Sequence, residues 1–205
     1  MADSSTTSSD AWLAQARRGD GCALGLLLQR YRAYLHLLAR SQIGPSLRGK
    51  VDASDAVQET FLKASGHFAQ FSGVSEPQLA AWLREILATS LANLARRYQG
   101  TQRRDVRRER QWVEGLDRSS KVLDRGLLGS RSTPSQLVSR HEQAVLVADA
   151  VVALPEASQE IIILRHLQEL SFPEIARRTG RSLDSVKNLW IRGLRRLRKT
   201  LEERP

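Results

Sequence analysis

Apolar side chains follow helical spacing along almost all of this chain of 205 residues, and signals for strands are almost absent. Apolar residues recur at every third or fourth position, which is the period of a helix with one buried face. We therefore predict an all-α fold. The predicted helices cover residues 10–18, 21–41, 53–65, 77–98, 101–114, 135–153, 156–169, 172–179 and 183–203.

One internal stretch interrupts this helical pattern. Residues 115–134 (GLDRSSKVLDRGLLGSRSTP) are rich in glycine, serine and charged side chains, a composition typical of flexible linkers. We predict that they join two small helical domains, an N-terminal one at 10–114 and a smaller C-terminal one at 135–205. Residues 1–9 are rich in Ser and Thr and are predicted to form a disordered tail.

The chain is strongly basic, with 32 Lys and Arg against 22 Asp and Glu, which indicates a polyanionic partner, either nucleic acid or an anionic membrane. The excess charge lies in two separate blocks. Residues 96–118 hold eight Arg against four acidic side chains, and residues 177–199 hold nine basic side chains against Asp184 alone. Each block lies at or beyond the end of a helical pattern.

The sequence gives little support for a membrane protein or a secreted protein. The longest apolar runs are far shorter than the ~20 residues that span a bilayer, and Met1–Asp10 lacks the pattern of a signal peptide. The single cysteine, Cys22, excludes a disulfide or zinc cluster within one chain and is typical of a reducing cytosol. We expect a cytoplasmic protein without membrane insertion, with Cys22 buried in its apolar helix.

The patterns of catalytic sites are missing as well. The histidines are scattered, and none has a partner at metal-ligand spacing: His36, His67, His141 and His166. Neither a Gly-rich phosphate loop nor a nucleophile elbow is present. We therefore expect no enzyme activity, no cofactor, no bound metal and no small-molecule substrate.

The C-terminal part contains the pattern of two helices joined by a tight turn. Ser171 to Glu174 has the pattern of a capping box, Gly180 ends the short helix that follows, and Ser182 offers an N-cap to a longer helix. One face of this longer helix is apolar, with Leu183, Val186, Trp190, Leu194, Leu197 and Leu201. The opposite face is polar and cationic, with Ser185, Asn188, Arg192, Arg195, Arg196 and Lys199.

This arrangement predicts a helix-turn-helix whose second helix enters the major groove of DNA. Asn and Arg side chains can form two hydrogen bonds to a base edge, and further cations neutralise phosphates. The alternative is that the charged face is only solvated, as most charged helix faces are. DNA binding is favoured because the single acid of the run, Asp184, suits a helix N-terminus and because the preceding turn fits.

A second motif lies in the N-terminal part, where Asp52 is predicted to cap a helix with an acid three residues further on. One face of this helix carries Ala53, Ala56, Val57, Thr60 and Ala64. The other face carries Asp55, Gln58, Glu59 and Leu62. An apolar Leu62 among acidic and polar side chains predicts a docking surface for a protein partner. The alternative is a solvated helix with one exposed leucine.

Both motifs resemble those of the bacterial sigma-70 family of RNA polymerase sigma factors. The residues that resemble its region 4 are Leu154–Glu156, Glu160–Arg165, Leu170–Ala176, Gly180, Ser182, Val186-Lys187 and Leu197-Arg198. The residues that resemble its region 2 are Asp52–Ala64, Ala81–Arg84 and Asn93-Leu94 with Arg96-Arg97. Because only a linker separates the motifs, the extracytoplasmic-function (ECF) subgroup fits best. Residues 41–45 and 186–196 also resemble a branch abundant in planctomycetes.

The resemblance implies partners and site residues. Region 4 would bind the promoter −35 element with the cationic face described above and with Lys187. Region 2 would dock on core RNA polymerase through Asp52, Asp55, Gln58, Glu59, Leu62 and Lys63. The −10 element would be melted and read by Phe68, Phe71, Trp82, Asn93, Arg96, Arg97, Arg103 and Arg104. Leu189 and Trp190 depart from the usual pattern of a polar and a small aliphatic residue, so the resemblance does not define the −35 sequence.

Alternatives stay open at three aromatic residues. Phe68 and Phe71 either stack on an unpaired base or fill the core of the domain. Trp82 lies off the apolar stripe of its helix and either wedges at the edge of the melted DNA or packs on a neighbouring helix. The members of that stripe are Leu83, Leu87, Leu91, Leu94 and Tyr98.

The sequence therefore predicts a sigma factor that binds core RNA polymerase, recognises promoter DNA and helps to open it. The alternative is a helix-turn-helix regulator that binds DNA but does not act on polymerase as a sigma factor. An anti-sigma protein is a further partner that the sequence leaves open.

Overall fold

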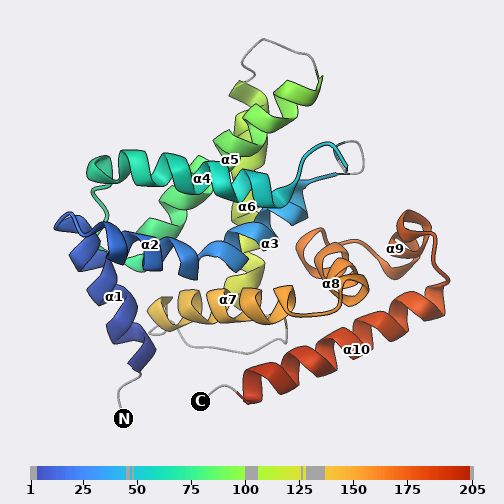
Figure 1. The fold of residues 1–205 in the computed structure, drawn as a ribbon. Coiled ribbons are helices and arrows are strands. Elements are labelled where there is room, and N and C mark those ends of the chain that lie inside the picture. Colours follow the sequence, from blue (N-terminus) through green and yellow to red (C-terminus); the bar gives the residue numbers. More distant parts are fainter. Residues whose placement is uncertain are drawn as a thin grey trace. The chain divides into compact units, whose positions relative to one another are not determined.

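The computed structural model describes residues 4–44, 47, 49–99, 106–125, 127 and 137–203. Every regular element in these ranges is helical (Figure 1), which confirms the predicted all-α fold. The chain divides into two compact units, Met1–Asp117 and Arg118–Pro205. Two helical units accord with the predicted pair of domains.

The first unit is built from helices that follow one another with short connections. They are α1 (Ser4–Arg17), α2 (Gly21–Arg30), α3 (Arg32–Gln42), α4 (Ala53–His67), the 3₁₀ turn η1 (Phe68–Gln70), α5 (Glu76–Gln99) and the beginning of α6 (Val106–Arg125). Asp52 caps α4, since its Oδ1 accepts a hydrogen bond of 2.8 Å from the N–H of Ser54. The predicted N-cap of the docking helix is thereby confirmed.

The core of the first unit lies where α3, α4 and α5 pack together. Leu83, Leu87 and Leu91, on the predicted apolar stripe of α5, are fully buried, and each such leucine contributes about 1.5–3 kcal/mol. Tyr31 Oη donates a hydrogen bond of 3.1 Å to the carboxylate of the buried Glu76. Burial and then the charge of Glu76 raise the pKa of Tyr31 well above its ordinary value, so the phenol stays a donor.

Two boundaries near the N-terminus differ from the predicted ones. Helix α1 begins at Ser4 rather than at residue 10, so much of the predicted tail is helical. The packing of α1 on α2, with Leu13 buried, gives this helix its tertiary support. The residues predicted as one helix over 21–41 form α2 and α3, which meet at Tyr31 without a side-chain cap that would mark the junction in the sequence.

Helix α6 runs well into the segment predicted as a linker, because it ends at Arg125 rather than at residue 114. Gly115 lies so close to the carboxamide of Gln42 that a Cβ at this position would collide with it. The buried side of α6 continues with Leu116, Ser119, Ser120 and Leu123. Glycine and serine here allow close packing, so residues 115–125 are helical rather than a flexible linker. Of residues 126–134, the described part of the chain includes Leu127 alone.

The second unit comprises the last turns of α6 and a compact group of further helices. They are α7 (Leu137–Val152), α8 (Glu156–Ile162), the π-helical turn η3 (Ile163–Leu167), α9 (Phe172–Thr179) and α10 (Leu183–Glu202). Helix α10 packs on α7, α8 and α9. The buried side chains of Ile161, Leu164, Ile175 and Val186 form a cluster that joins α8, η3, α9 and α10. This cluster holds the two C-terminal helices in place.

Candidate nucleic-acid interface

Helices α9 and α10 form the helix-turn-helix that the sequence predicts. The Ser171 N–H donates a 2.8 Å hydrogen bond to the Glu174 carboxylate, and Ser171 Oγ accepts one of 3.4 Å from the Glu174 N–H, as in a capping box. Hydrogen bonds from the Ser171 hydroxyl and then from its N–H lower the pKa of Glu174. Gly180 ends α9 with a φ of 65°, which glycine adopts without steric strain. Ser182 Oγ then caps α10 by accepting a hydrogen bond from the Ser185 N–H.

Helix α10 presents a cationic face to solvent. The exposed members of the predicted recognition face are Lys187, Asn188, Arg192, Arg195, Arg196 and Lys199. The exposed arc is rotated relative to the prediction, because it also contains Ile191 and Arg198, whereas Ser185 is half-buried. Leu183, predicted on the apolar face, is exposed as well. The helical period alone identified the two faces but not the angle at which α10 rests on its neighbours.

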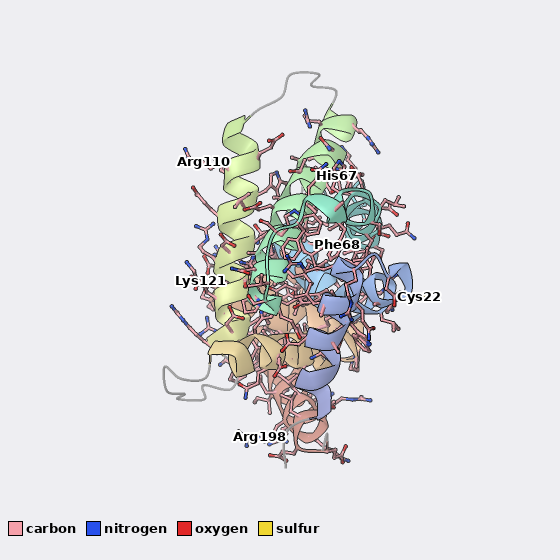
Figure 2. The ribbon with its side chains drawn as sticks, turned by 90° about the vertical axis from the view of Figure 1, so that its left-hand side faces the viewer. Cys22, His67, Phe68, Arg110, Lys121 and Arg198 are labelled. Atoms are coloured by element: carbon pink, nitrogen blue, oxygen red, sulfur yellow. The ribbon has the colours of Figure 1, made fainter. Side chains whose placement is uncertain are left out.

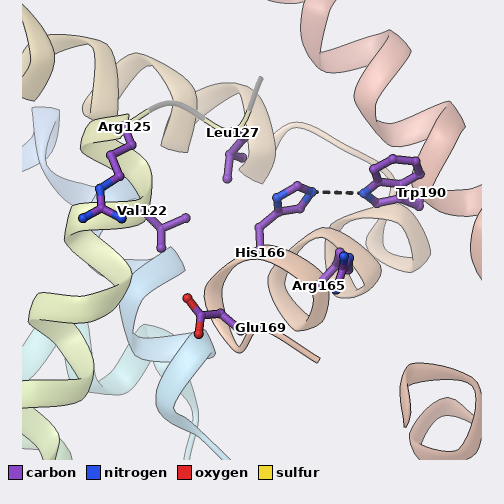
Figure 3. Close-up of a pocket in the computed structure, with 7 residues that line it drawn as sticks. All are labelled: Val122, Arg125, Leu127, Arg165, His166, Glu169 and Trp190. Carbon is purple, nitrogen blue, oxygen red and sulfur yellow. Dashed lines mark hydrogen bonds between the residues drawn. The ribbon is translucent and has the colours of Figure 1, made fainter. Parts of the chain in front are cut away.

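Trp190 anchors α10 to the rest of the second unit. Its ring meets that of Phe172 edge-on at a centroid distance of 5.3 Å and lies nearly parallel to the His166 ring at 6.3 Å. Trp190 Nε1 donates a hydrogen bond of 3.0 Å to His166 Nε2 (Figure 3). Beside this pair lies a cavity of about 420 Å³, lined by Val122, Arg125, Leu127, Arg165, His166, Glu169 and Trp190.

The hydrogen bond from Trp190 requires a neutral His166. An imidazole Nε2 accepts only when its ring carries a single proton, on Nδ1. Burial, and then the positive charge of Arg165, lower the pKa of His166 below its ordinary value of 6.5. The neutral ring is therefore favoured at neutral pH. The sequence did not predict this contact, because no local pattern links positions that lie 24 residues apart.

Helix α4 exposes most of the predicted docking residues. Leu62 is 76% exposed, and Asp52, Asp55 and Gln58 are exposed around it. The opposite side is buried as predicted, with Ala53, Ala56, Val57, Thr60 and Ala64. A large apolar side chain that faces solvent among polar ones is suited to a protein interface.

Two predicted docking residues are engaged within the first unit. Lys63 Nζ lies 2.7 Å from Glu59 Oε1 and donates a hydrogen bond of 3.1 Å to Ser90 Oγ on α5. Both charged side chains are only partly exposed. Lys63 thereby connects α4 to α5, and Glu59 holds the Lys63 ammonium from the same helix, so both have a positioning contact in addition to any contact with a partner.

Phe68, Phe71 and Trp82, each of which has two alternative roles by sequence, pack together where α4, η1 and α5 meet. Phe68 and Phe71 are only 7% and 9% exposed, and the half-buried Trp82 lies with its ring centroid 5.1 Å from that of Phe71. Both phenylalanines are thus inaccessible to a base in this structure, and core filling is the alternative that the geometry favours. Gly73 confines the Phe71 ring, because a Cβ at this position would overlap it, and no sequence pattern marks this contact.

Predicted −10 residues gather at the C-terminal end of α5. Arg96 donates a hydrogen bond to Asn93 Oδ1, and its guanidinium lies 3.9 Å from Glu109 on α6. Arg97 is exposed. Two further predicted residues, Arg103 and Arg104, lie outside the described residues.

Among the described residues, no three His, Cys, Asp or Glu side chains are placed to hold a metal ion. No described helix is both long enough and apolar enough to cross a membrane. Cys22 is exposed on α2 (Figure 2), so the prediction of a buried thiol is wrong. The buried side of α2 is formed instead by Ala23, Leu27 and Leu28.

A capped helix-turn-helix with a cationic second helix defines the second unit as a DNA-binding domain. Residues 144–197 match the family model described as Sigma-70, region 4. This range contains α8, the turn η3, α9 and most of α10, which are the elements of the site described above.

Similarity to known proteins extends over both units. The chain is 30% identical over 149 residues to the RNA polymerase sigma factor YlaC of Bacillus subtilis, covering 73% of this chain and 77% of that protein. It is 32% identical over 162 residues to the ECF RNA polymerase sigma-E factor of Salmonella typhimurium, covering 79% and 78%. It is 29% identical over 193 residues to the RNA polymerase sigma factor NccH of Alcaligenes xylosoxydans, covering 94% of each.

The chain belongs to the ECF group of the sigma-70 family of RNA polymerase sigma factors. It is a transcription initiation factor rather than an enzyme. The family resemblance and the predicted function are thereby confirmed at this level, whereas the likeness to a planctomycete branch stays a prediction.

Proposed function

We propose that this sigma factor docks on core RNA polymerase through the exposed face of α4 and reads promoter DNA with both of its units. The second unit binds the −35 element through α10, and the first unit melts and reads the −10 element through α5. The observation that carries this proposal is the exposed face of α10. It gathers six cations, Lys187, Arg192, Arg195, Arg196, Arg198 and Lys199, on a helix that the capped turn holds in place.

On α10, we assign base reading to Asn188 and Arg192. They lie one helical turn apart on the exposed side, and both side chain types can form two hydrogen bonds to a base edge. Lys187, Arg195, Arg196 and Lys199 supply contacts to phosphates. Ser185 is less suited to contact DNA because it is half-buried.

On α4, we assign the anchoring contact with polymerase to Leu62, with Asp52, Asp55 and Gln58 as its polar rim. An anchor of this kind is worth about 2 kcal/mol or more in an interface. Lys63 supports the surface by connecting α4 to Ser90 on α5, and Glu59 holds Lys63 in place.

On α5, we assign contacts with the −10 element to Trp82, Asn93, Arg96 and Arg97. Phe68 and Phe71 contribute indirectly, because they pack against the Trp82 ring and hold it in place at the surface of the unit. Arg103 and Arg104 continue the same basic block of the sequence, and we assign them to the DNA backbone.

Core polymerase and chromosomal DNA lie in the cytoplasm, so we expect this protein to act there. An anti-sigma protein would block it most directly by covering the Leu62 face of α4, because that face is the exposed apolar anchor of the docking surface.

The test is co-purification of the tagged full chain with core polymerase, followed by mapping of transcription starts after overexpression. We expect core polymerase to co-purify and new starts to share two upstream sequence elements. A chain that binds DNA but neither retains polymerase nor creates new starts would instead be a helix-turn-helix regulator.

A further inference from the structure

Helix α10 carries an apolar side chain in the middle of its cationic face. Ile191 is 38% exposed there, and none of the contacts assigned above uses it. Lys187 and Asn188 lie one turn before it and Arg195 lies one turn after it, and all three are exposed. We infer that Ile191 reads a thymine of the −35 element by packing on the 5-methyl group of that base in the major groove. This inference rests on the proposed function.

The packing of α10 within the second unit keeps Ile191 turned outward. The buried positions of this helix are Val186, Gly193 and Leu197. At about 100° per residue, Ile191 lies roughly 140° around the helix from Val186, which is nearly the opposite side. Gly193 packs closely on α8, because a Cβ at this position would lie 3.4 Å from the nearest side chains of that helix. Rotation of α10 would break this contact, so Ile191 faces whatever binds the cationic face.

The surroundings of Ile191 distinguish it from an ordinary exposed apolar residue. Single exposed apolar side chains are common on protein surfaces and have no defined partner. Ile191 instead lies among cations and an amide, on a face whose proposed partner is DNA, so it enters the groove together with its neighbours. Because isoleucine is branched at Cβ, its χ1 angle is nearly fixed in a helix. The side chain therefore presents its methyl groups in one direction and loses little entropy when it packs on a base.

The base edges offer this side chain an apolar partner. In the major groove the 5-methyl group of thymine is the apolar part of a pattern that otherwise consists of hydrogen-bond donors and acceptors. Arg192 suits the acceptors of guanine, and Asn188 suits the donor and acceptor of adenine. Neither side chain recognises a methyl group. Ile191 therefore supplies a discrimination that its polar neighbours lack.

The position of Ile191 on α10 limits where this thymine can lie. At about 1.5 Å per residue, Ile191 lies roughly 4.5 Å along the helix axis from Asn188 and about 1.5 Å from Arg192. Successive base pairs are about 3.4 Å apart along DNA. The thymine should therefore lie within one base pair of the position at which Arg192→Ala changes specificity.

The experiment measures binding of the complete holoenzyme to promoter duplexes from a mapped transcription start. Each thymine of the −35 element, on either strand, is replaced singly by deoxyuridine, which keeps the base pair and removes only the 5-methyl group. We expect the wild-type protein to lose about fourfold in affinity at one thymine, the effect of withdrawing one methyl group from an apolar contact. Ile191→Ala should bind the thymine duplex at least about fourfold more weakly than wild type. It should also bind the thymine and uracil duplexes equally, because the two changes remove the same contact.

The matched control is Val152→Ala, which shortens another exposed branched side chain of the second unit and should keep the wild-type preference for thymine. The inference is overturned if wild type tolerates uracil at every −35 position or if the −35 element contains no A·T pair. It is also overturned if a folded Ile191→Ala variant keeps the preference or if Val152→Ala loses it. If replacement of whole base pairs in the −35 element leaves binding unchanged, the proposed function itself fails.

Discussion

Replacement of Trp190 by phenylalanine removes one hydrogen bond of the second unit, together with part of the ring that packs on His166. Phenylalanine keeps a ring beside Phe172 but removes the Nε1 donor, so His166 Nε2 loses its partner. A buried acceptor left without a partner costs about 1–3 kcal/mol. Because His166 is only half-buried, we expect the lower part of that range, about 1–2 kcal/mol. For a domain of this size, that loss lowers the melting temperature by about 4–16 °C.

The same variant should change the response to pH. The folded pKa of His166 is lowered, so its stabilising effect is complete above the ordinary value of 6.5 and is lost as the pH falls through the lowered pKa. Arg165 is the charged group that contributes to the lowered pKa, and Arg125 and Glu169 line the same cavity. Without the Trp190 donor, the neutral ring is favoured less, so the pKa rises toward 6.5 and the pH dependence weakens.

Thermal unfolding followed by circular dichroism between pH 5 and 8 tests both effects. His36 also has a lowered pKa through burial, so the difference between wild type and variant is the quantity that isolates His166. His166→Gln is the matched control, because its amide oxygen can still accept from Trp190 but does not titrate. A Trp190→Phe variant with the melting temperature and pH profile of the wild type would refute the reasoning.

Two further predictions concern the proposed interfaces, and a third concerns the aromatic cluster of the first unit. Leu62→Asp should weaken retention of core polymerase by about 2 kcal/mol without unfolding the first unit, whereas Leu26→Asp, at another exposed leucine (52%), should not; equal pull-down by both variants would contradict the docking assignment. Arg192→Ala should reduce discrimination at one −35 base position by about 1–3 kcal/mol. Lys199→Ala should instead weaken binding to all DNA sequences alike and lower the slope of log affinity against log salt concentration by about 1. Identical specificity profiles of the two variants would contradict the assignment of Arg192 to bases and Lys199 to phosphates. Gly73→Ala should push away the phenylalanine ring two residues earlier and destabilise the first unit by about 1–3 kcal/mol; a melting curve identical to that of the wild type would show that the ring is not confined.

Local signals were enough to predict the helix-turn-helix. The Ser171–Glu174 capping box, the left-handed Gly180 and the cap at Ser182 each involve residues at most four positions apart, so their hydrogen bonds can be inferred from spacing alone. The buried side of α4 followed from its helical period for the same reason. The family resemblance rested on these same short patterns.

Features that depend on tertiary contacts could not be predicted in this way. The rotation of α10 depends on the contact of Trp190 with His166, which only the packed unit brings together. Gly115 and its neighbouring serines indicate a linker by composition, yet Gly115 is buried against the distant Gln42. Lys63 belongs to the polar face by its position in the helix, but its length lets it reach Ser90 on α5.

The exposure of Cys22 makes the natural sequence suitable for site-specific chemical labelling. The chain has one cysteine, and it lies on the exposed side of α2. A maleimide dye would therefore attach at a single position, on a helix separate from those assigned to polymerase and DNA. The anisotropy of that dye would follow formation of the holoenzyme and of its promoter complex without any substitution. The same exposure means that an oxidising buffer would link two copies of the chain through this thiol, so such experiments require a reductant until the dye is attached.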